Sequence, residues 1–311
     1  MMDLVALRSL IAVDVHGTVV AAAQAGGYTP SAVSQQIKRL EKDLGVVLLE
    51  KVGRGVVLTD EGRTLVRHGH GILRQVEAAT AGIGGEQGEP AGPLRIVAFS
   101  TAVRGLVAPL LADLAKTSPA LVPELYERDP AEAVDTVAAG QADLGLVHHW
   151  VGVALQRPDF VEGEVIGLDI ADLLVRADHR LAGAGSVTPA DLVDEPWAST
   201  PVGSICHGWF LYMFAGFARP PRVRYWSWEF ASHVRLVEEV GAVALVPRLG
   251  RGPLPEGVVA VEVSGPVPTR VIEMIWRGSM SSSPAIRHVR ERCSALFAPL
   301  AENPGRRTSM V

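Results

Sequence analysis

The chain has 311 residues, a formal net charge of −5, 48% hydrophobic residues and 20% charged residues. This is enough apolar material for a packed core, which excludes a wholly disordered chain, and the length allows two or three domains. Two cysteines are too few for a disulfide framework, a four-cysteine zinc site or an iron–sulfur cluster. The first residues, Met1-Met2-Asp3-Leu4, lack the pattern of a signal peptide, and no run of about 18 apolar residues follows, so we expect a cytoplasmic protein with no membrane partner.

The beginning of the chain predicts two short helices. Leu4, Leu7 and Ile11 follow helical spacing and define one apolar face. Gly17-Thr18 then ends the first helix and caps a second, which Gly26-Gly27 ends.

A third helix is predicted over 30–43, because Thr29 is a good N-cap and Pro30 suits the first helical position. Its outer face carries hydroxyls and an amide near the N-terminus, then cations. Such groups can bond base edges and phosphates of double-stranded DNA in a major groove. Taken alone, a stripe of this kind is more often only a solvated face. The predicted DNA-binding residues on this helix are Thr29, Pro30, Ser31, Ser34, Gln35, Lys38 and Arg39.

A hairpin and a long helix follow. Strands are expected over 46–49 and 56–58, with Arg54 at the tip, where an arginine suits a narrow minor groove or a phosphate. The helix, over 60–81, has apolar positions that the small domain is not expected to cover, so we expect pairing with a second copy. Its glycines, Gly69 and Gly71, should each weaken it by about 1 kcal/mol. The apolar positions are Leu65, Val66, Ile72, Leu73 and Val76.

Residues 83–92 are rich in Gly, Glu and Pro and predict a hinge. Beyond them, apolar runs alternate with helical stretches, which predicts an α/β region with a mostly parallel sheet. Its length favours two lobes, lobe I at about 93–165 and 265–301 and lobe II at about 166–264. The expected strands are 94–99, 122–127, 143–147, 170–175, 223–227, 242–246, 258–263 and 271–276, and the expected helices are 104–115, 130–139, 205–217, 230–239 and 284–297.

Three segments, 18–23, 29–41 and 53–62, together resemble the N-terminus of LysR-type transcriptional regulators. The remainder resembles the periplasmic-binding-protein-like effector domain of that family. The resemblance implies a winged helix-turn-helix at 1–59, a linker and dimerisation helix at 60–82, a hinge at 83–92 and a two-lobed effector domain at 93–301. It also implies a homodimer or homotetramer that contacts RNA polymerase, with no cofactor and no enzymatic activity.

The effector is expected at the carboxyl ends of the strands, where ligands gather in open α/β sheets. Hydroxyls and free N–H groups there suit a carboxylate or another anion. Two of the candidates below have an alternative to effector binding: Trp150 can pack in the core, and Glu229 can cap a helix. Adjacent His148 and His149 point to opposite sides of a strand, so no metal site is expected. The candidate effector residues are Ser100, Thr101, His148, Trp150, Thr200, Gly203, Ser204 and Glu229.

These patterns predict a sequence-specific DNA-binding regulator that responds to a small molecule held between the lobes. An exported solute-binding module is disfavoured by the DNA-binding pattern. An enzyme is disfavoured because no set of nucleophile, base and orienting residue is visible. Cys206 is either a redox-sensing thiol or, as we favour, a half-buried helix residue with no resolving cysteine nearby.

Overall fold

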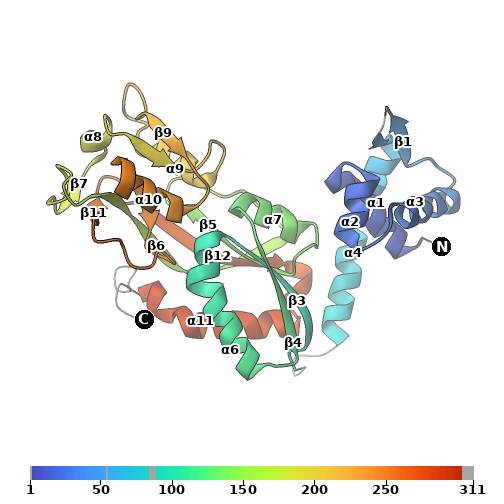
Figure 1. The fold of residues 1–311 in the computed structure, drawn as a ribbon. Coiled ribbons are helices and arrows are strands. Elements are labelled where there is room, and N and C mark those ends of the chain that lie inside the picture. The colour runs from blue at the N-terminus through green and yellow to red at the C-terminus, as the bar shows by residue number, and fades with distance from the viewer. Residues whose placement is uncertain (1, 54, 84–88, 303–311) are drawn as a thin grey trace. The chain divides into compact units, whose positions relative to one another are not determined.

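The computed structural model describes residues 2–53, 55–83 and 89–302, and the chain divides into two compact units, Met1–Ile83 and Gly84–Val311 (Figure 1). Each unit has its own hydrophobic core. Arg54, at the expected tip of the hairpin, and residues 84–88 of the expected hinge lie outside the described residues.

The N-terminal unit is a three-helix cluster followed by a hairpin and a long helix. Thr29 caps the third helix by accepting a hydrogen bond from the Ala32 amide, and Gly45 ends the helix in a left-handed conformation, as the sequence predicts. The first hairpin strand begins at Leu49, three residues later than expected, because the Glu41 carboxylate accepts the Leu48 and Leu49 amides and fixes the preceding turn. The elements are α1 (Leu4–His16), α2 (Val19–Gly26), α3 (Pro30–Leu44), β1 (Leu49–Val52), β2 (Gly55–Leu58) and α4 (Asp60–Ile83).

The expectation that the apolar side chains of α4 lack a partner within the small domain was wrong for four of the five residues, and Val76 is not part of that core. Val66 is buried in the core of its own unit, and Leu65, Ile72 and Leu73 pack against that core. A Cβ built on Gly69 would lie 2.8 Å from Leu7 Cδ1 in α1. The missing side chain therefore allows the two helices to approach, and α4 covers the core of the helix cluster.

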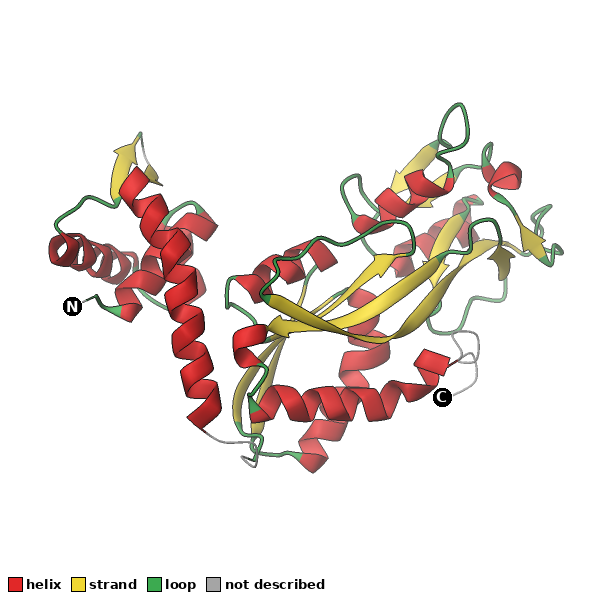
Figure 2. Cartoon of the chain, turned by 180° about the vertical axis from the view of Figure 1, so that it is seen from behind, coloured by secondary structure: helices red, strands yellow, loops and turns green. Residues whose placement is uncertain are grey.

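The C-terminal unit is built on a mixed sheet with strand order β4-β3-β5-β12-β6-β11-β7, and β10 pairs with β6 (Figure 2). The expected mostly parallel sheet was wrong: β12 is antiparallel to both β5 and β6, and β6 is antiparallel to β10 and β11. For the first lobe the cause is the return of the chain through β12, which lies in the sheet between β5 and β6, two strands that come much earlier in the sequence. The strands are β3 (Gly92–Ala98), β4 (Leu121–Glu127), β5 (Leu144–Trp150), β6 (Val161–Arg176), β7 (Ser186–Val187), β8 (Trp197–Ser199), β9 (Val223–Trp226), β10 (Ala244–Pro247), β11 (Val258–Val263) and β12 (Thr269–Arg277).

Helices cover both faces of this sheet. Alternate side chains of β3, β5 and β12 pack on α6 and α11 on one face and on α7 on the other. Further along the sheet, α9 and α10 contribute to two separate clusters with β6, β10 and β11. The helices are α5 (Ser100–Ala102), a π-helical turn (Val103–Val107), α6 (Ala108–Thr117), α7 (Pro130–Ala138), α8 (Pro189–Leu192), α9 (Ile205–Met213), α10 (Phe230–Val240), a 3-10 turn (Gly278–Met280) and α11 (Pro284–Glu302).

Several expected boundaries are corrected. β5 continues through Trp150, so His148 and His149 lie within the strand and not after it. The helix expected over 104–115 starts at residue 100 and is interrupted by the π-helical turn. The short elements β7, α8 and β8 were not predicted. In the described part of the chain, no single helix is long and apolar enough to cross a membrane. The helices α1 and α2 are long and apolar enough only when taken together, and they are bent by 119° where they meet.

Candidate DNA-binding surface and effector site

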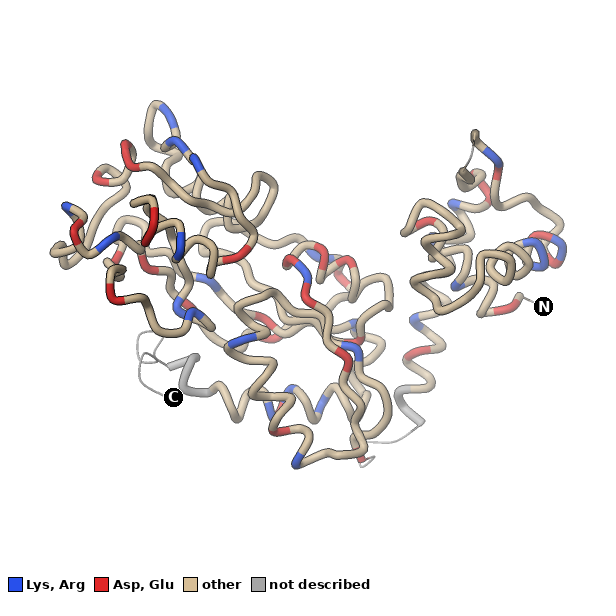
Figure 3. The backbone as a smooth tube through the Cα atoms, viewed as in Figure 1, with Lys and Arg blue, Asp and Glu red and all other residues tan. Residues whose placement is uncertain are grey.

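The outer face of α3 is exposed because its other face is anchored in the core. Val33, Ile37 and Leu40 are buried. The hydroxyl- and amide-bearing residues occupy the N-terminal half of α3, and the basic residues occupy the C-terminal half together with Glu41 and Asp43. Figure 3 shows the charged positions gathered toward one end of this helix. The exposed polar residues of this surface are Thr29, Ser31, Gln35, Lys38, Arg39 and Lys42, and Pro30 is exposed beside them.

The N-terminal hydroxyls of α3 form a local network. Thr29 Oγ1 accepts from the Ala32 amide at 3.2 Å and lies 3.0 Å from Ser31 Oγ. Ser34 is half-buried, and its hydroxyl donates to the Pro30 carbonyl at 2.9 Å. All three predicted DNA-binding hydroxyls therefore have a partner within the helix start, and Thr29 and Ser31 are the exposed ones.

Two residues at this surface were missed in the sequence. Tyr28 precedes the helix and is 47% exposed, so it extends the outer face beyond Thr29. Glu41 holds the turn that leads from α3 into β1. Tyr28 could have been predicted, because it is an aromatic residue directly before the N-cap Thr29. No local sequence pattern indicates the contacts of Glu41.

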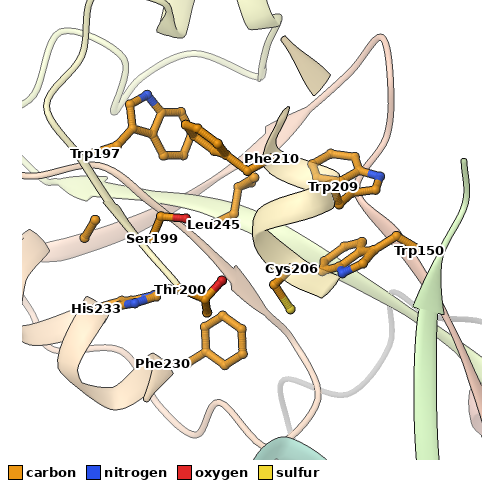
Figure 4. Close-up of a pocket in the computed structure, with 11 residues that line it drawn as sticks. Trp150, Trp197, Ser199, Thr200, Cys206, Trp209, Phe210, Phe230, His233 and Leu245 are labelled. Carbon is orange, nitrogen blue, oxygen red and sulfur yellow. The ribbon is translucent and has the colours of Figure 1, made fainter. Parts of the chain in front are cut away.

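Aromatic side chains of the C-terminal unit surround a small pocket with a cavity volume of about 20 Å³, room for about one water molecule (Figure 4). Two predicted effector residues, Trp150 and Thr200, line it. Ser100, Thr101, His148, Gly203, Ser204 and Glu229 are absent from its lining. The lining residues are Trp150, Trp197, Ala198, Ser199, Thr200, Cys206, Trp209, Phe210, Phe230, His233 and Leu245.

Of the predicted effector residues outside the pocket lining, some make hydrogen bonds within the protein and others are exposed to solvent. The Ser204 hydroxyl donates to Thr200 Oγ1 at 2.8 Å and accepts from the His207 amide at 3.1 Å, which caps α9. Gly203 and Glu229 are exposed, and Glu229 makes no side-chain cap bond to α10. Ser100 is half-buried at the start of α5.

His148 and Thr101 are buried near Arg270, a charged residue that was not predicted from the sequence. Arg270 of β12 is 0% exposed, donates from Nε to Asp169 Oδ2 at 3.0 Å, and donates from Nη2 to Asp169 and to Thr101 Oγ1, the latter at 3.1 Å. The ring of His148 lies 4.6 Å from the ring of Phe99, centroid to centroid. Burial, and then the positive charge of Arg270, hold the pKa of His148 well below its ordinary value, so its imidazole is neutral.

Cys206 lies beside this cluster, with its sulfur 4.0 Å from His148 Nε2. Burial raises the pKa of the Cys206 thiol to about 11, and the nearby charge of Arg270 offsets only part of that effect. Because the thiolate is the reactive form, this environment keeps the sulfur protonated and unreactive near neutral pH. Within the described residues no group of His, Cys, Asp and Glu is arranged to hold a metal ion.

An exposed polar helix in a three-helix cluster with a β-hairpin, joined in sequence to a mixed α/β unit with a pocket, defines a winged helix-turn-helix regulator with a ligand-binding domain. Comparison with protein families agrees. Residues 87–298 match the LysR substrate binding domain, and residues 4–63 match the bacterial regulatory helix-turn-helix protein of the lysR family. The chain belongs to the LysR family of DNA-binding transcriptional regulators, whose members are not enzymes, and the expected fold class is confirmed.

Individual proteins show the same likeness. The HTH-type transcriptional regulator ShiR of Corynebacterium glutamicum is 32% identical over 177 residues, which span 56% of this chain and 58% of ShiR. A full-length OxyR variant from Pseudomonas aeruginosa superposes with a TM-score of 0.72 at 20% identity, covering 94% of this chain and 98% of that one. Full-length CbnR in complex with its target DNA gives a TM-score of 0.54 at 21% identity, covering 94% and 99%. At these identities the structural likeness speaks to the fold alone.

Proposed function

We propose that this protein binds specific DNA sequences through the outer face of α3 and changes transcription in response to a small molecule bound by its C-terminal unit. The observation that carries the proposal is the exposed row Ser31, Gln35 and Lys38 on a helix that the buried residues Val33 and Ile37 hold rigidly. Amide and hydroxyl groups at the N-terminal half of a helix suit base edges, and lysine suits phosphate.

The individual DNA contacts follow from the same geometry. Gln35 reads a base, Lys38 and Arg39 neutralise phosphates, and Thr29, Pro30, Ser31 and Ser34 place the helix N-terminus against the backbone. Arg54 reaches the neighbouring groove from the hairpin. A dimer or tetramer presents two or more of these N-terminal DNA-binding units to a DNA site with two-fold symmetry. The protein acts in the cytoplasm, where it contacts RNA polymerase.

The effector side of the proposal rests on the pocket and its surroundings. Trp150 and Thr200 contact the ligand directly, Thr101 accepts a hydrogen bond from the adjacent Arg270, and His148 stands beside Trp150. Ser100, Gly203, Ser204 and Glu229 stand at strand or helix ends around the site and would meet the ligand when the lobes close. The linker helix at 60–82, the hinge at 83–92 and the two lobes of 93–301 couple ligand binding to the DNA-binding heads.

A selection from random oligonucleotides tests the proposal. Full-length protein, with and without a metabolite extract, should enrich one sequence with two-fold symmetry, and the enriched duplex should bind at least about a thousandfold more tightly than random duplex. Protein that enriches no sequence under either condition would refute the proposed DNA recognition.

A further inference from the structure

A loop after β10 carries Leu249 into the core of the other half of the C-terminal unit. Leu249 is buried in the cluster that contains Ala102 and Leu106, together with side chains of β3, β5 and β12. Of the described residues in 167–264, which fall in the predicted lobe II, it alone belongs to this cluster. The buried apolar side chains of β10 and β11 belong to the clusters formed with α9 and α10. Leu249 therefore packs across the boundary between the two predicted lobes.

Two glycines make this contact possible. A Cβ atom built on Gly105 would lie 2.5 Å from Leu249 Cδ1 and 3.1 Å from the nitrogen of Gly250. A Cβ atom built on Gly250 would lie 2.6 Å from the carbonyl oxygen of Thr101. Because protein interiors are close-packed, a side chain at either position would push the loop away from lobe I. We call the contact of Leu249 and Gly250 with residues 101–105 the latch.

The tip of the loop is fixed to lobe II on both sides. Arg248 donates from Nε to Asp172 at 3.0 Å, and Arg251 donates from Nη1 to the same carboxylate at 2.8 Å. Asp172 lies on β6, where that strand pairs with β10. Since both neighbours of the tip are tied to β6, Leu249 and Gly250 move with lobe II and not as a free loop.

The segment that receives the tip is irregular. Helix α5 passes into the π-helical turn Val103–Val107 before α6 begins. Turns of this kind are rare overall and are frequent at functional positions. Gly105 is the middle residue of the turn, and Arg104 beside it donates from Nε to the Gly250 carbonyl at 2.9 Å. The latch thus combines a buried leucine with an exposed hydrogen bond.

Asp169 allows the latch to open without separating charges. Its Oδ1 accepts from the Leu249 amide at 2.9 Å, whereas its Oδ2 accepts from Arg270 Nε at 3.0 Å. Arg270 lies directly opposite Asp169 on the neighbouring strand, so this pair stays together when Leu249 leaves. A buried carboxylate that lost its cation would be strongly destabilising. Opening exposes one leucine side chain and breaks the bonds of the Leu249 amide and of Arg104, but it leaves no buried charge without its partner.

The small pocket requires a movement of this kind. Its cavity volume of about 20 Å³ holds about one water molecule, whereas sites for organic ligands measure roughly 300–1,000 Å³. Leu245 lines the pocket from β10, the strand that leads into the latch loop, and Trp150 lines it from β5, opposite Arg270. The latch is therefore connected to two walls of a pocket that must enlarge before a small molecule can enter it.

We propose that the latch is releasable: it holds lobe II against lobe I, and withdrawal of Leu249 from lobe I is the movement that admits a small molecule to the pocket. This rests on the effector response proposed above and names the contact that must open first. A molecule that keeps the pocket enlarged keeps Leu249 out of lobe I, so the two shapes of the C-terminal unit differ in this contact.

Hydrogen–deuterium exchange of the full-length protein tests the latch. Gly105→Ala places a Cβ atom against Leu249 and should release it. Peptides that cover 100–107 and 248–252 should then exchange at least about tenfold faster than in the parent, because overpacking destabilises the contact locally, while β3 and β11 keep their rates. Gly257→Ala is the matched control, since its Cβ would meet no atom within 4 Å, and it should change neither segment.

A second variant acts without added bulk. Arg104→Ala removes the hydrogen bond to Gly250 and should speed exchange in the same two segments about fivefold. Unchanged exchange of these segments in a folded Gly105→Ala protein, or in Arg104→Ala where Gly105→Ala does not fold, overturns the latch. Faster exchange that spreads to β3 and β11 overturns it as well, because Leu249 would then belong to a core that unfolds as one.

DNA binding separates this inference from the proposed function. On the selected duplex, Gly105→Ala should give a DNase I footprint that differs in length from that of the parent, whereas Gly257→Ala should give the footprint of the parent. Release of both segments with equal footprints overturns the part of the latch in the response and leaves the regulator intact. Release of both segments in a protein that selects no DNA sequence supports the latch and refutes the regulator.

Discussion

At the residue scale, the outer face of α3 separates two kinds of contact that mutation can distinguish. Gln35 offers an amide that can pair with a base edge, whereas Lys38 offers only a charge. Gln35→Ala should reduce discrimination at one base-pair position by about 1–3 kcal/mol and leave the affinity for random DNA unchanged. Lys38→Ala should weaken binding to all sequences and reduce the slope of log affinity against log salt by about 1.

Fluorescence anisotropy at several salt concentrations, with the selected duplex and its single-base variants, measures both effects. Arg8→Ala is the control, because Arg8 is an exposed cation on α1 and not on α3. If Gln35→Ala and Lys38→Ala changed affinity in the same way for every duplex, the assignment of separate roles would be wrong.

Buried histidines give the C-terminal unit a dependence on pH. Burial lowers the pKa of His148 and of His233 below the ordinary value of 6.5. In the unfolded chain both titrate near that value, so below it the unfolded state binds more protons than the folded one. The contribution of these neutral histidines to the free energy of unfolding is therefore fully present above pH 6.5 and decreases as the pH falls below that value. The midpoint of urea unfolding should decrease from pH 7 to pH 5, and a His233→Gln variant should lose less over this interval than the parent.

The residues of α3 were predictable from the sequence, whereas the buried contacts of Arg270 were not. Thr29, Pro30 and Gln35 are neighbours in the chain, and their helical spacing is a local pattern. Arg270 meets Trp150 and Asp169 only because β12 enters the sheet between β5 and β6, about a hundred residues after both of those strands began. A charged residue at the start of an apolar strand was the one local signal.

At the scale of elements, the ends of α2 and α3 were predicted well because their caps are local, whereas the helix expected over 205–217 ends at Met213. α2 and α3 begin and end at the capping residues that the sequence indicates. Strand direction was predicted wrongly as mostly parallel, since it depends on where the chain returns, and β12 runs antiparallel to both of its neighbours. The first hairpin strand was misplaced for a similar reason: a carboxylate from the preceding helix, Glu41, sets its start.

The contact between α4 and α1 yields a prediction with an internal control. A Cβ at Gly69 would lie 2.8 Å from Leu7 Cδ1 and 3.2 Å from Ile11 Cδ1, whereas at Gly71 the nearest atom is 3.9 Å away. Gly69→Ala should destabilise the N-terminal unit by about 1–3 kcal/mol through overpacking. Gly71→Ala should instead stabilise it by about 0.5–1 kcal/mol, because alanine is the better helix former. Urea unfolding followed by circular dichroism measures both, and equal stabilisation by the two changes would contradict the close helix contact.

At the scale of the whole molecule, the chain holds separate cores in its two units. The core of the N-terminal unit is formed by residues of α1 to α4, and the clusters of the C-terminal unit are formed only by residues after 93. Residues that share one hydrophobic core unfold together. Two separate cores therefore predict two unfolding transitions. Such independence lets one unit bind ligand and the other bind DNA while each retains its own packing.

Substitutions confined to one core test that independence. Asp172 is 3% exposed and accepts hydrogen bonds from Arg248 and Arg251. Asp172→Asn leaves Arg251 without this counter-charge and leaves Arg248 with only the exposed Glu262, 3.5 Å away. It should destabilise the C-terminal unit by about 2–4 kcal/mol. In differential scanning calorimetry, Asp172→Asn should lower the midpoint temperature of only one of two unfolding transitions. Gly69→Ala should lower the midpoint temperature of only the other. A single transition that both variants shift would mean that the two units unfold together, and ligand binding would then stabilise the DNA-binding unit directly rather than through the linker.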